Sequence, residues 1–229
     1  MKARKVLSKP ASIAIVLHYI LGYGMLYPAI INWWHTHTRI NYQARMTVNT
    51  GIYVFVFLVT VIPALPVLKY GWEKLTDSYG KNVRFIINSE FLMMALLGVS
   101  ALVLSIFGLR NSRNQSEIHK AMMMSPYYYS LLISLFAPFV EETVFRVCIF
   151  ARLKESGLKV PGYLVSAVSF GFIHIMDSVL KGYFWELPFI IPYSLLGFVL
   201  AFVYDRTESV WCSILLHMLH NSLSLLLGA

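Results

Sequence analysis

Polar side chains that can do acid-base chemistry lie inside long apolar stretches in the second half of this sequence. They are Glu141, Glu142, Arg146, His174, His217 and Asn221. Such stretches are long enough to cross a bilayer, where each ionisable group costs about 2.5–3.5 kcal/mol to insert and usually marks a functional site. Two adjacent carboxylates, with imidazoles on later stretches, are typical of a centre that moves protons or activates water.

Helical spacing separates these residues by role. Glu142 and Arg146 are four residues apart, so they stack on one helix face and can form an ion pair. Glu141 points about 100° away from Glu142 and is not stacked on the arginine. Because burial disfavours its charge, Glu141 is a candidate general base. Pro138 cannot donate to the carbonyl of Ser134, which predicts a kink that leaves room for water beside Glu141.

The remaining polar residues come from two further stretches. His217 and Asn221 are four apart and share a helix face, with His220 close to it, so two donors can hold an oxyanion. His174 can hold a water against Glu141 or ligate a metal with it. At 1.5 Å per residue, Glu141 and His217 each lie roughly 16 Å from the nearest basic residue at the membrane edge, and His174 about 22 Å. The three helices are therefore expected to meet at one level.

Composition predicts the fold class. Hydrophobic residues make up 58% of the 229 residues and charged residues 13%, about half the charged fraction of soluble domains. Long charge-free gaps predict an all-α, polytopic helical membrane protein with about seven spans, in a range of six to eight. The gaps are Pro10–Thr38, Met46–Leu68, Phe91–Leu109, Ala121–Val140, Val160–Met176, Leu187–Tyr204 and Ser209–Ala229. The fourth continues through the acid pair to about Phe150, and spans two and three are expected to have uncharged centres.

Basic residues predict the orientation. Sorting the loops alternately puts twelve Lys and Arg residues on the side of the amino terminus and six on the other, so the amino terminus is expected to be cytoplasmic. This bias accounts for the net charge of +8 without nucleic acid. The first span lacks an obvious cleavage site and is interpreted as uncleaved. Residues 1–229 are expected to form one membrane domain with a catalytic core at about 127–229.

Connections and isolated residues carry further expectations. Asn32–Asn49, Tyr70–Ser89 and Asn111–Ser125 are interpreted as connections, and Met122–Tyr129 as an interfacial stretch. Residues interpreted as structural are His18, the buried thiols Cys148 and Cys212, and Asp205 with Arg206 as a loop ion pair. For His220, Asp177 and Asn221, hydrogen bonding between helices is an open alternative to a role in the site.

Other functions leave signatures that are missing or weak here. A proton-coupled transporter also uses buried acids and histidines, but the sequence has no inverted repeat. The His-Glu-x-x-His motif of zinc proteases and a Gly-x-Ser-x-Gly elbow are absent. Cys148 lies seven residues from Glu141, which makes a nucleophile conceivable. An inert thiol is favoured, because its helix offers only the already paired Arg146 to activate it.

Three ordered motifs resemble one family. Glu-Glu-x-x-x-Arg at Glu141–Arg146, Phe-x-x-x-His at Phe170–His174 and His-x-x-x-Asn at His217–Asn221 are similar to those of the CPBP family. This family comprises CAAX proteases and bacteriocin-processing enzymes, is also called the Abi family, and includes the type II CAAX prenyl endopeptidases. The resemblance implies an intramembrane endopeptidase in which Glu141 and His174 activate water, and His217 and Asn221 stabilise the oxyanion. Glu142 and Arg146 are then structural support.

The resemblance leaves cofactor and substrate open. A glutamate-histidine mechanism needs no metal, whereas Glu141, His174 and His217 could also hold zinc with one open position. The expected partners are the lipid bilayer of a bacterial cell and a peptide or membrane-anchored protein. Its class could be a prenylated CAAX protein, a bacteriocin or pheromone leader, or a membrane-anchored regulator. A non-proteolytic protein for bacteriocin self-immunity or scaffolding is the alternative.

Overall fold

The structure is a computed structural model that describes residues 5–38 and 41–227. Helices make up most of this part of the chain, and it contains no strand, which confirms the all-α prediction. The elements in chain order are α1 (Lys9–Leu17), η1 (His18–Leu26), α2 (Tyr27–His37), α3 (Tyr42–Asp77), α4 (Tyr79–Ile106), α5 (Arg113–Met124), α6 (Pro126–Leu131), η2 (Leu132–Phe136), α7 (Ala137–Glu142), η3 (Thr143–Phe150), α8 (Ala151–Glu155), α9 (Lys159–Leu180), η4 (Phe184–Phe189), α10 (Ile190–Thr207) and α11 (Val210–Leu227).

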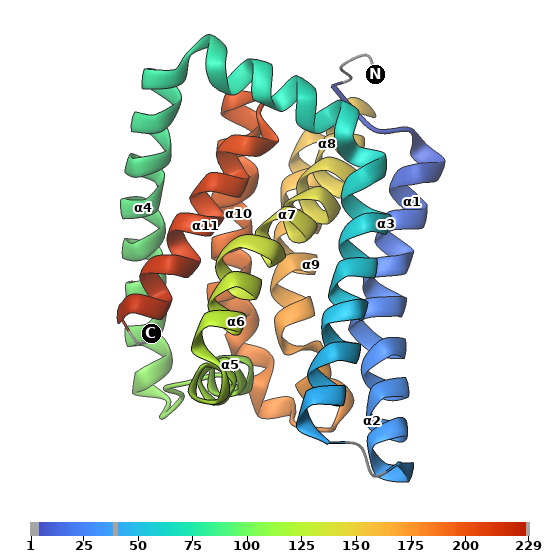
Figure 1. The fold of residues 1–229 in the computed structure, drawn as a ribbon. Coiled ribbons are helices and arrows are strands. Elements are labelled where there is room, and N and C mark those ends of the chain that lie inside the picture. The colour runs from blue at the N-terminus through green and yellow to red at the C-terminus, as the bar shows by residue number, and fades with distance from the viewer. Residues whose placement is uncertain (1–4, 39–40, 228–229) are drawn as a thin grey trace.

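Six helical segments in the described residues are long and apolar enough to cross a membrane. They are Lys9–His37, Gln43–Asp77, Tyr79–Ile106, Lys159–Leu180, Phe184–Thr207 and Val210–Leu227. The predicted fourth span is not among them, yet residues 126–155 are helical without interruption, from α6 through α8. This segment carries the acid pair and packs inside the bundle (Figure 1). The protein is therefore a polytopic all-α membrane protein.

The predicted connections are shorter than expected, because helices extend into them. Ser78 alone separates α3 from α4, so the interpretation of Tyr70–Ser89 as a connection is wrong. Two prolines, Pro63 and Pro66, lie inside α3, and helices bend at such positions. Beyond them α3 runs across one end of the bundle to α4 (Figure 1). We call this the α1 end, because α1 begins there.

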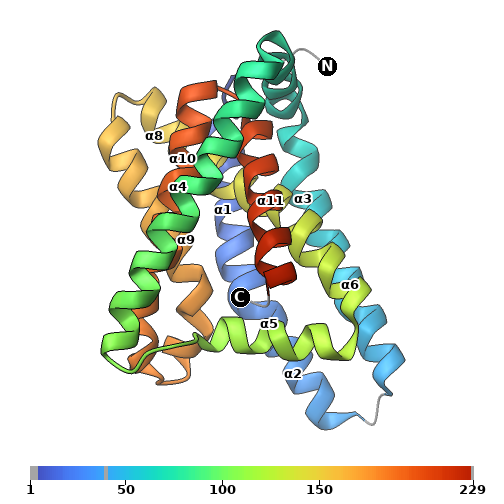
Figure 2. The same cartoon turned by 90° about the vertical axis from the view of Figure 1, so that its left-hand side faces the viewer.

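A helix closes the opposite end of the bundle. Much of Asn111–Ser125, expected to be a connection, is the helix α5, which Ser112 caps by accepting the N–H of Gln115. Figure 2 shows α5 lying across the bundle at right angles to the spans, as an interfacial helix does. We call this the α5 end. Its first turn is anchored by the buried carboxylate of Glu186, which accepts the Arg113 N–H at 3.0 Å.

Two glycines set the approach of α9 to α10. A Cβ at Gly171 would lie 2.8 Å from the carbonyl oxygen of Ile190, and one at Gly197 would lie 3.1 Å from that of Ala167. Small residues at such crossings let two backbones pack closely inside a membrane. This contact brings His174 of α9 against Tyr193 of α10, whose rings stack with centroids 4.6 Å apart.

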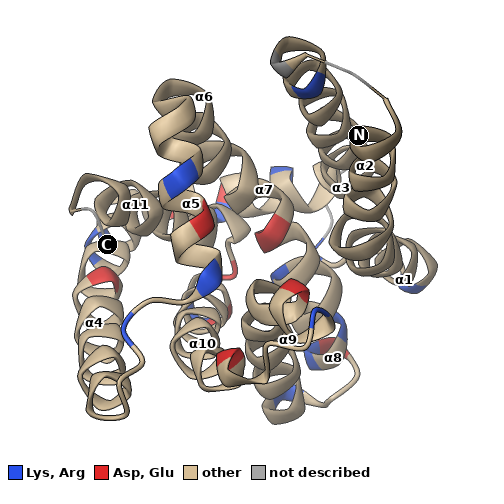
Figure 3. Ribbon diagram, turned by 90° about the horizontal axis from the view of Figure 1, so that it is seen from below, with Lys and Arg blue, Asp and Glu red and all other residues tan. Residues whose placement is uncertain are grey.

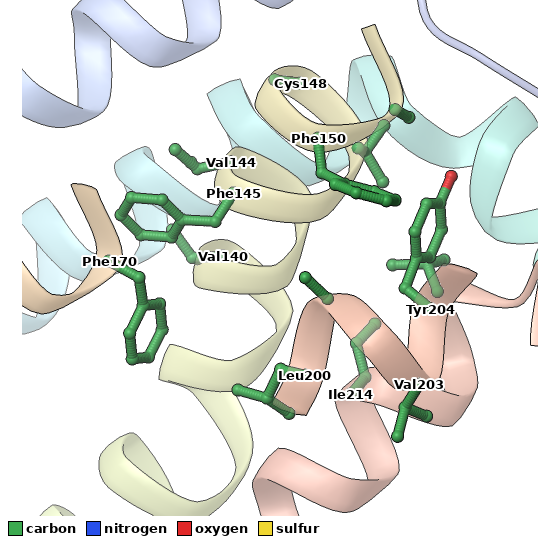
Figure 4. Close-up of a cluster of buried hydrophobic side chains, with 14 of the residues drawn as sticks. Val140, Val144, Phe145, Cys148, Phe150, Phe170, Leu200, Val203, Tyr204 and Ile214 are labelled. Carbon is green, nitrogen blue, oxygen red and sulfur yellow. The ribbon is translucent and has the colours of Figure 1, made fainter. Parts of the chain in front are cut away.

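A hydrophobic core fills the bundle between the acid pair and the α1 end. Every residue of η3 except Ile149 is buried, and Figure 4 shows Phe145 and Phe150 packed among side chains of neighbouring helices. Cys148 is 5% exposed and belongs to this core, and Cys212 is fully buried. Both are free thiols, which confirms the interpretation of these two cysteines as buried and unlinked.

One predicted ion pair is wrong. Asp205 does not pair with Arg206: its carboxylate lies 2.6 Å from Lys154 Nζ and 2.8 Å from Lys159 Nζ. It also accepts the Tyr163 hydroxyl at 2.8 Å. Because α10 continues to Thr207, residues 205 and 206 are consecutive helical positions that point about 100° apart. Asp205 therefore joins α10 to α8 and α9 instead.

Candidate active site

Glu142 and Arg146 form a fully buried ion pair. The Arg146 Nε lies 2.9 Å from one Glu142 oxygen, and Nη2 donates to the other at 3.1 Å. Both side chains are 0% exposed. Arg146 Nη1 also donates to the Ser166 hydroxyl at 3.2 Å, and the guanidinium lies 4.9 Å from the centre of the Phe170 ring. The pair expected from the i,i+4 spacing is present, and it ties η3 to α9.

His217 lies between the two glutamates. Its Nδ1 is 3.0 Å from a Glu142 oxygen, and its Nε2 is 3.8 Å from a Glu141 oxygen. A carboxylate paired with arginine only accepts hydrogen bonds, so Nδ1 carries the proton and donates to Glu142. The arginine pair therefore orients the imidazole so that Nε2 faces Glu141. This is an acid-oriented histidine beside a second acid, the arrangement of a catalytic general acid-base site.

Glu141 differs from Glu142 because no described Lys or Arg side chain forms an ion pair with it. Its nearest polar contacts in the described structure are His217 and the Tyr19 hydroxyl, which donates at 3.4 Å. The side chain is 14% exposed, and it lies in the wall of a cavity of about 260 Å³. Elements η1, α3, α5, α6, η2 and α7 line this cavity, with Tyr23, Tyr53 and Tyr129 among its residues. A water or a substrate carbonyl can therefore reach Glu141.

His174 approaches the site from α9. Its Nδ1 lies 2.8 Å from the Phe170 carbonyl, which can only accept, so Nδ1 is the donor and Nε2 of the neutral ring holds the lone pair. The ring packs against Phe170 at 4.7 Å, and Phe170 in turn contacts the His217 ring at 5.7 Å. Phe170 thus links the two histidines, and among the described residues no hydrogen bond joins His174 to Glu141.

Asn221 reaches the same segment as His217 but contacts its backbone. Its amide Nδ2 donates to the Ile133 carbonyl at 2.8 Å. In η2 the Ala137 N–H bonds to the Leu132 carbonyl, five residues back. Continued by one residue, this register would pair the Ile133 carbonyl with position 138, where proline has no N–H. Asn221 therefore satisfies a carbonyl that Pro138 leaves unpaired, and one N–H of its amide remains for another partner.

The acid pair lies between two π-helical segments. Glu141 and Glu142 end α7, with η2 before it and η3 directly after it. Insertions of π-helix into α-helices are frequent at functional sites, because the wider turn changes the direction of the side chains that follow. The sequence predicts only a kink at Pro138. The extended π register also changes the helical facing of Cys148, which lies in the apolar core (Figure 4).

Other polar residues singled out in the sequence lie outside this centre. Asp177 is exposed and pairs with Lys181 at 2.7 Å. His18 Nε2 bonds to the Tyr27 hydroxyl at 2.8 Å, in keeping with a structural role.

His220 pairs with a residue that the sequence analysis missed. Its Nδ1 lies 3.0 Å from Glu90 Oε1, and both side chains are 7% exposed. The charge-free gap was taken to start at Phe91, but α4 begins at Tyr79, so Glu90 lies well inside a span. The expectation of an uncharged third span is therefore wrong. A helix that starts after Ser78 places Glu90 inside the span, whereas its pairing with His220, which joins α4 to α11, is a tertiary contact.

The metal hypothesis was tested against the side-chain positions. A catalytic zinc ion takes three protein ligands, and among the described residues no group of three His, Cys, Asp or Glu side chains is arranged to hold a metal ion. As placed, Glu141, His174 and His217 do not fit a zinc site.

These features define a helical membrane protein with a buried acid-histidine centre beside a cavity. Residues 123–223 match the model of the family described as type II CAAX prenyl endopeptidase Rce1-like, a region that contains all three motifs. This match confirms the resemblance predicted from the motifs: this region of the chain is similar to the Rce1-like CAAX prenyl endopeptidases.

Curated relatives from bacteria resemble the chain over most of its length. "Putative membrane peptidase YdiL" of Bacillus subtilis (strain 168) is 27% identical over 93% of this chain and 80% of its own. "UPF0177 protein YvdC" of Lactococcus lactis subsp. lactis (strain IL1403) is 24% identical over 95% of this chain and 77% of its own. No solved structure matches at a significant level.

The buried ion pair predicts an asymmetry between single and double substitutions. We expect Glu142→Ala or Arg146→Ala to lower the amount of folded protein several-fold, because each leaves an uncompensated buried charge, which costs about 3–5 kcal/mol. The double variant Glu142→Leu, Arg146→Leu should accumulate better than either single variant. The measurement is fluorescence-detected size-exclusion chromatography of detergent extracts. Normal accumulation of both single variants with lost activity would show that the pair acts in the reaction rather than in folding.

The contact between Asn221 and the Ile133 carbonyl predicts an energetic coupling to Pro138. Asn221→Ala should destabilise the protein by about 1 kcal/mol through loss of a hydrogen bond to a buried carbonyl. In a Pro138→Ala background the restored N–H takes that role, so the same substitution should cost clearly less. Unfolding in detergent for the four proteins of this double-mutant cycle measures the coupling. Additive effects would contradict the structural role of Asn221.

Proposed function

We propose that the protein is an intramembrane endopeptidase that hydrolyses a peptide bond of a membrane-associated peptide or protein. The observation that carries the proposal is the contrast between the two glutamates. Glu142 is neutralised by Arg146, whereas Glu141 faces a cavity with a histidine beside it. A carboxylate that has no ion pair with a described Lys or Arg, inside a low-dielectric bundle, is suited to accept a proton.

In the proposed reaction, Glu141 takes a proton from a water while the water oxygen adds to the substrate carbonyl carbon. His174 offers its Nε2 lone pair as the second acceptor that orients this water. Before substrate binds, His217 takes a second proton from solvent on Nε2, while Nδ1–H stays on Glu142. Its Nε2–H and the remaining N–H of Asn221 then stabilise the tetrahedral oxyanion. Glu141 then returns the proton to the leaving nitrogen as the C–N bond breaks. Glu142 and Arg146 hold His217 in place.

The substrate remains within the classes that the family resemblance implies: a prenylated CAAX protein, a bacteriocin or pheromone leader, or a membrane-anchored regulator. The bacterial origin of the relatives supports a bacterial membrane as the location. The non-proteolytic alternative is self-immunity or scaffolding, in which the same cluster would serve only to hold the helices together.

The proposal predicts that three side chains are essential for cleavage but not for accumulation. Glu141→Gln, His174→Ala and His217→Ala should each lower cleavage by about 10²–10⁴-fold, the range of a lost general acid-base group. The membrane peptidome of cells carrying wild-type protein, compared with Glu141→Gln, shows whether cleavage occurs and which peptide is cut. Undiminished biological function in Glu141→Gln would favour the non-proteolytic alternative.

Two controls separate this mechanism from others. Cys148→Ala should cleave like the wild type, because the thiol lies in the core and touches no substrate. Treatment of the purified enzyme with a chelator should leave cleavage unchanged, since the described side chains offer no group of three ligands. Stoichiometric zinc together with chelator sensitivity would overturn the metal-free mechanism.

We further propose that the α1 end is cytoplasmic, which the bias of basic residues towards that end supports. Single cysteines at exposed lysines test this, because both native thiols are buried and should give little background. A membrane-impermeant maleimide added to intact cells should label Lys120→Cys of α5. It should label Lys81→Cys only after permeabilisation. The reverse pattern would place the α1 end outside.

A further inference from the structure

A second cavity of about 440 Å³ adjoins the first, and the proposed reaction does not use it. It lies between η1, α2, α3 and α9, towards the end of the bundle where α2 finishes and α3 starts. Tyr23 and Tyr53 line both cavities. With volumes of about 260 and 440 Å³, the pair is comparable in size to the binding sites of ordinary ligands, which measure about 300–1,000 Å³.

A wall of tyrosines joins Glu141 to this second cavity. The Tyr19 hydroxyl donates to Glu141 at 3.4 Å. The Tyr19 ring stacks on Tyr23 with centroids 5.3 Å apart, and Tyr23 contacts Tyr53 at 6.0 Å. Tyrosine surfaces combine apolar rings with polar tips, as surfaces that bind polypeptide do. A chain whose scissile bond reaches Glu141 can therefore continue along this wall into the second cavity.

Two polar atoms in the second cavity have no partner. His35 Nε2 and Asn49 Oδ1 are buried and make no hydrogen bond to any described residue. An amide oxygen only accepts, so Asn49 requires an N–H or O–H donor. Leaving such an atom buried and unsatisfied costs about 1–3 kcal/mol. The backbone N–H groups of an extended peptide are donors of the required kind.

The charged residues that line the two cavities disfavour a ligand with a free terminal carboxylate. Among the described residues that line them there is no Lys or Arg. Besides Glu141, the charged lining residues are Glu117 and Asp177, each paired with a lysine of its own helix. A free terminal carboxylate would thus find no Lys or Arg among the lining residues to pair with, and would lie in the same pair of cavities as the carboxylate of Glu141. Figure 3, which views the molecule from the α5 end, shows acidic positions on α5, α7 and α9.

We propose that the second cavity is a subsite for an internal polypeptide segment that flanks the scissile bond, with Asn49 and His35 binding its backbone. This inference rests on the proposed function for the reaction at Glu141, but binding can be tested without cleavage. It makes Asn49 and His35 determinants of affinity rather than of the chemical step.

Photocrosslinking locates the bound segment. The probe is a randomised pool of peptides about ten residues long, roughly 33 Å when extended, with acetyl and amide ends, added to purified Glu141→Gln protein. Benzoylphenylalanine at Ile31, which lines the second cavity, should crosslink to the pool. At the neighbouring Ile30, which is 53% exposed, it should not. Equal crosslinking at both positions, or none at Ile31, would overturn the subsite.

Affinity and kinetics test the residue roles. Asn49→Ala and His35→Ala should each weaken binding of the blocked pool about two- to tenfold, in line with the loss of one hydrogen bond. The exposed Thr47→Ala on the same helix is the matched control and should bind like the parent protein. With a peptide that the wild type cleaves, the two variants should raise KM and leave kcat unchanged. A fall in kcat at unchanged KM would contradict the assignment.

Two further outcomes separate this inference from the proposed function. Crosslinking at Ile31 without cleavage by the wild-type protein would retain the subsite and reject the endopeptidase. Cleavage without crosslinking at Ile31 would retain the endopeptidase and reject the subsite. Peptides with free carboxylate ends could also bind through that terminus as tightly as the blocked pool binds. This outcome would reject the proposal that the subsite holds an internal segment.

Discussion

The buried contact of Arg146, Glu142 and His217 is the interaction on which the rest of the site depends. Arg146 compensates the charge of Glu142 at full burial, and His217 contacts the same carboxylate at 3.0 Å. The network fixes which nitrogen of His217 carries the proton and which nitrogen faces Glu141. It also anchors η3 to α9 through Ser166. The buried ion pair and the orientation of the His217 imidazole therefore depend on the same contacts.

Around this network the backbone departs from a regular α-helix. Pro138 removes a donor, the π register of η2 shifts the unpaired carbonyl to Ile133, and Asn221 satisfies it from α11. The acid pair is thus held by two contacts from one helix, His217 to a side chain and Asn221 to a backbone carbonyl. This arrangement places the irregular backbone where it lines a cavity, the setting in which membrane proteins tolerate it.

Parts of the fold were predictable because they follow from local rules. Long apolar runs predict spanning helices, and the four-residue spacing of Glu142 and Arg146 predicts their ion pair. The missed features have non-local causes. Glu90 was overlooked because the helix start was inferred from charge instead of from the turn at Ser78, and its partner His220 lies 130 residues away. The pairing of Asp205 with two lysines likewise depends on how α8, α9 and α10 pack.

The sequence by itself determined the membrane class, the family resemblance and the candidate residues, because hydropathy and motif spacing are properties of a single chain. Only the tertiary structure decided which glutamate is neutralised and which faces a cavity, what orients each histidine, and where Asn221 donates. The physical reason is that burial and hydrogen-bond partners belong to the contacts between helices. In a span with two adjacent carboxylates, either one could be neutralised and the other could face the cavity. The positions of the neighbouring side chains decide between them.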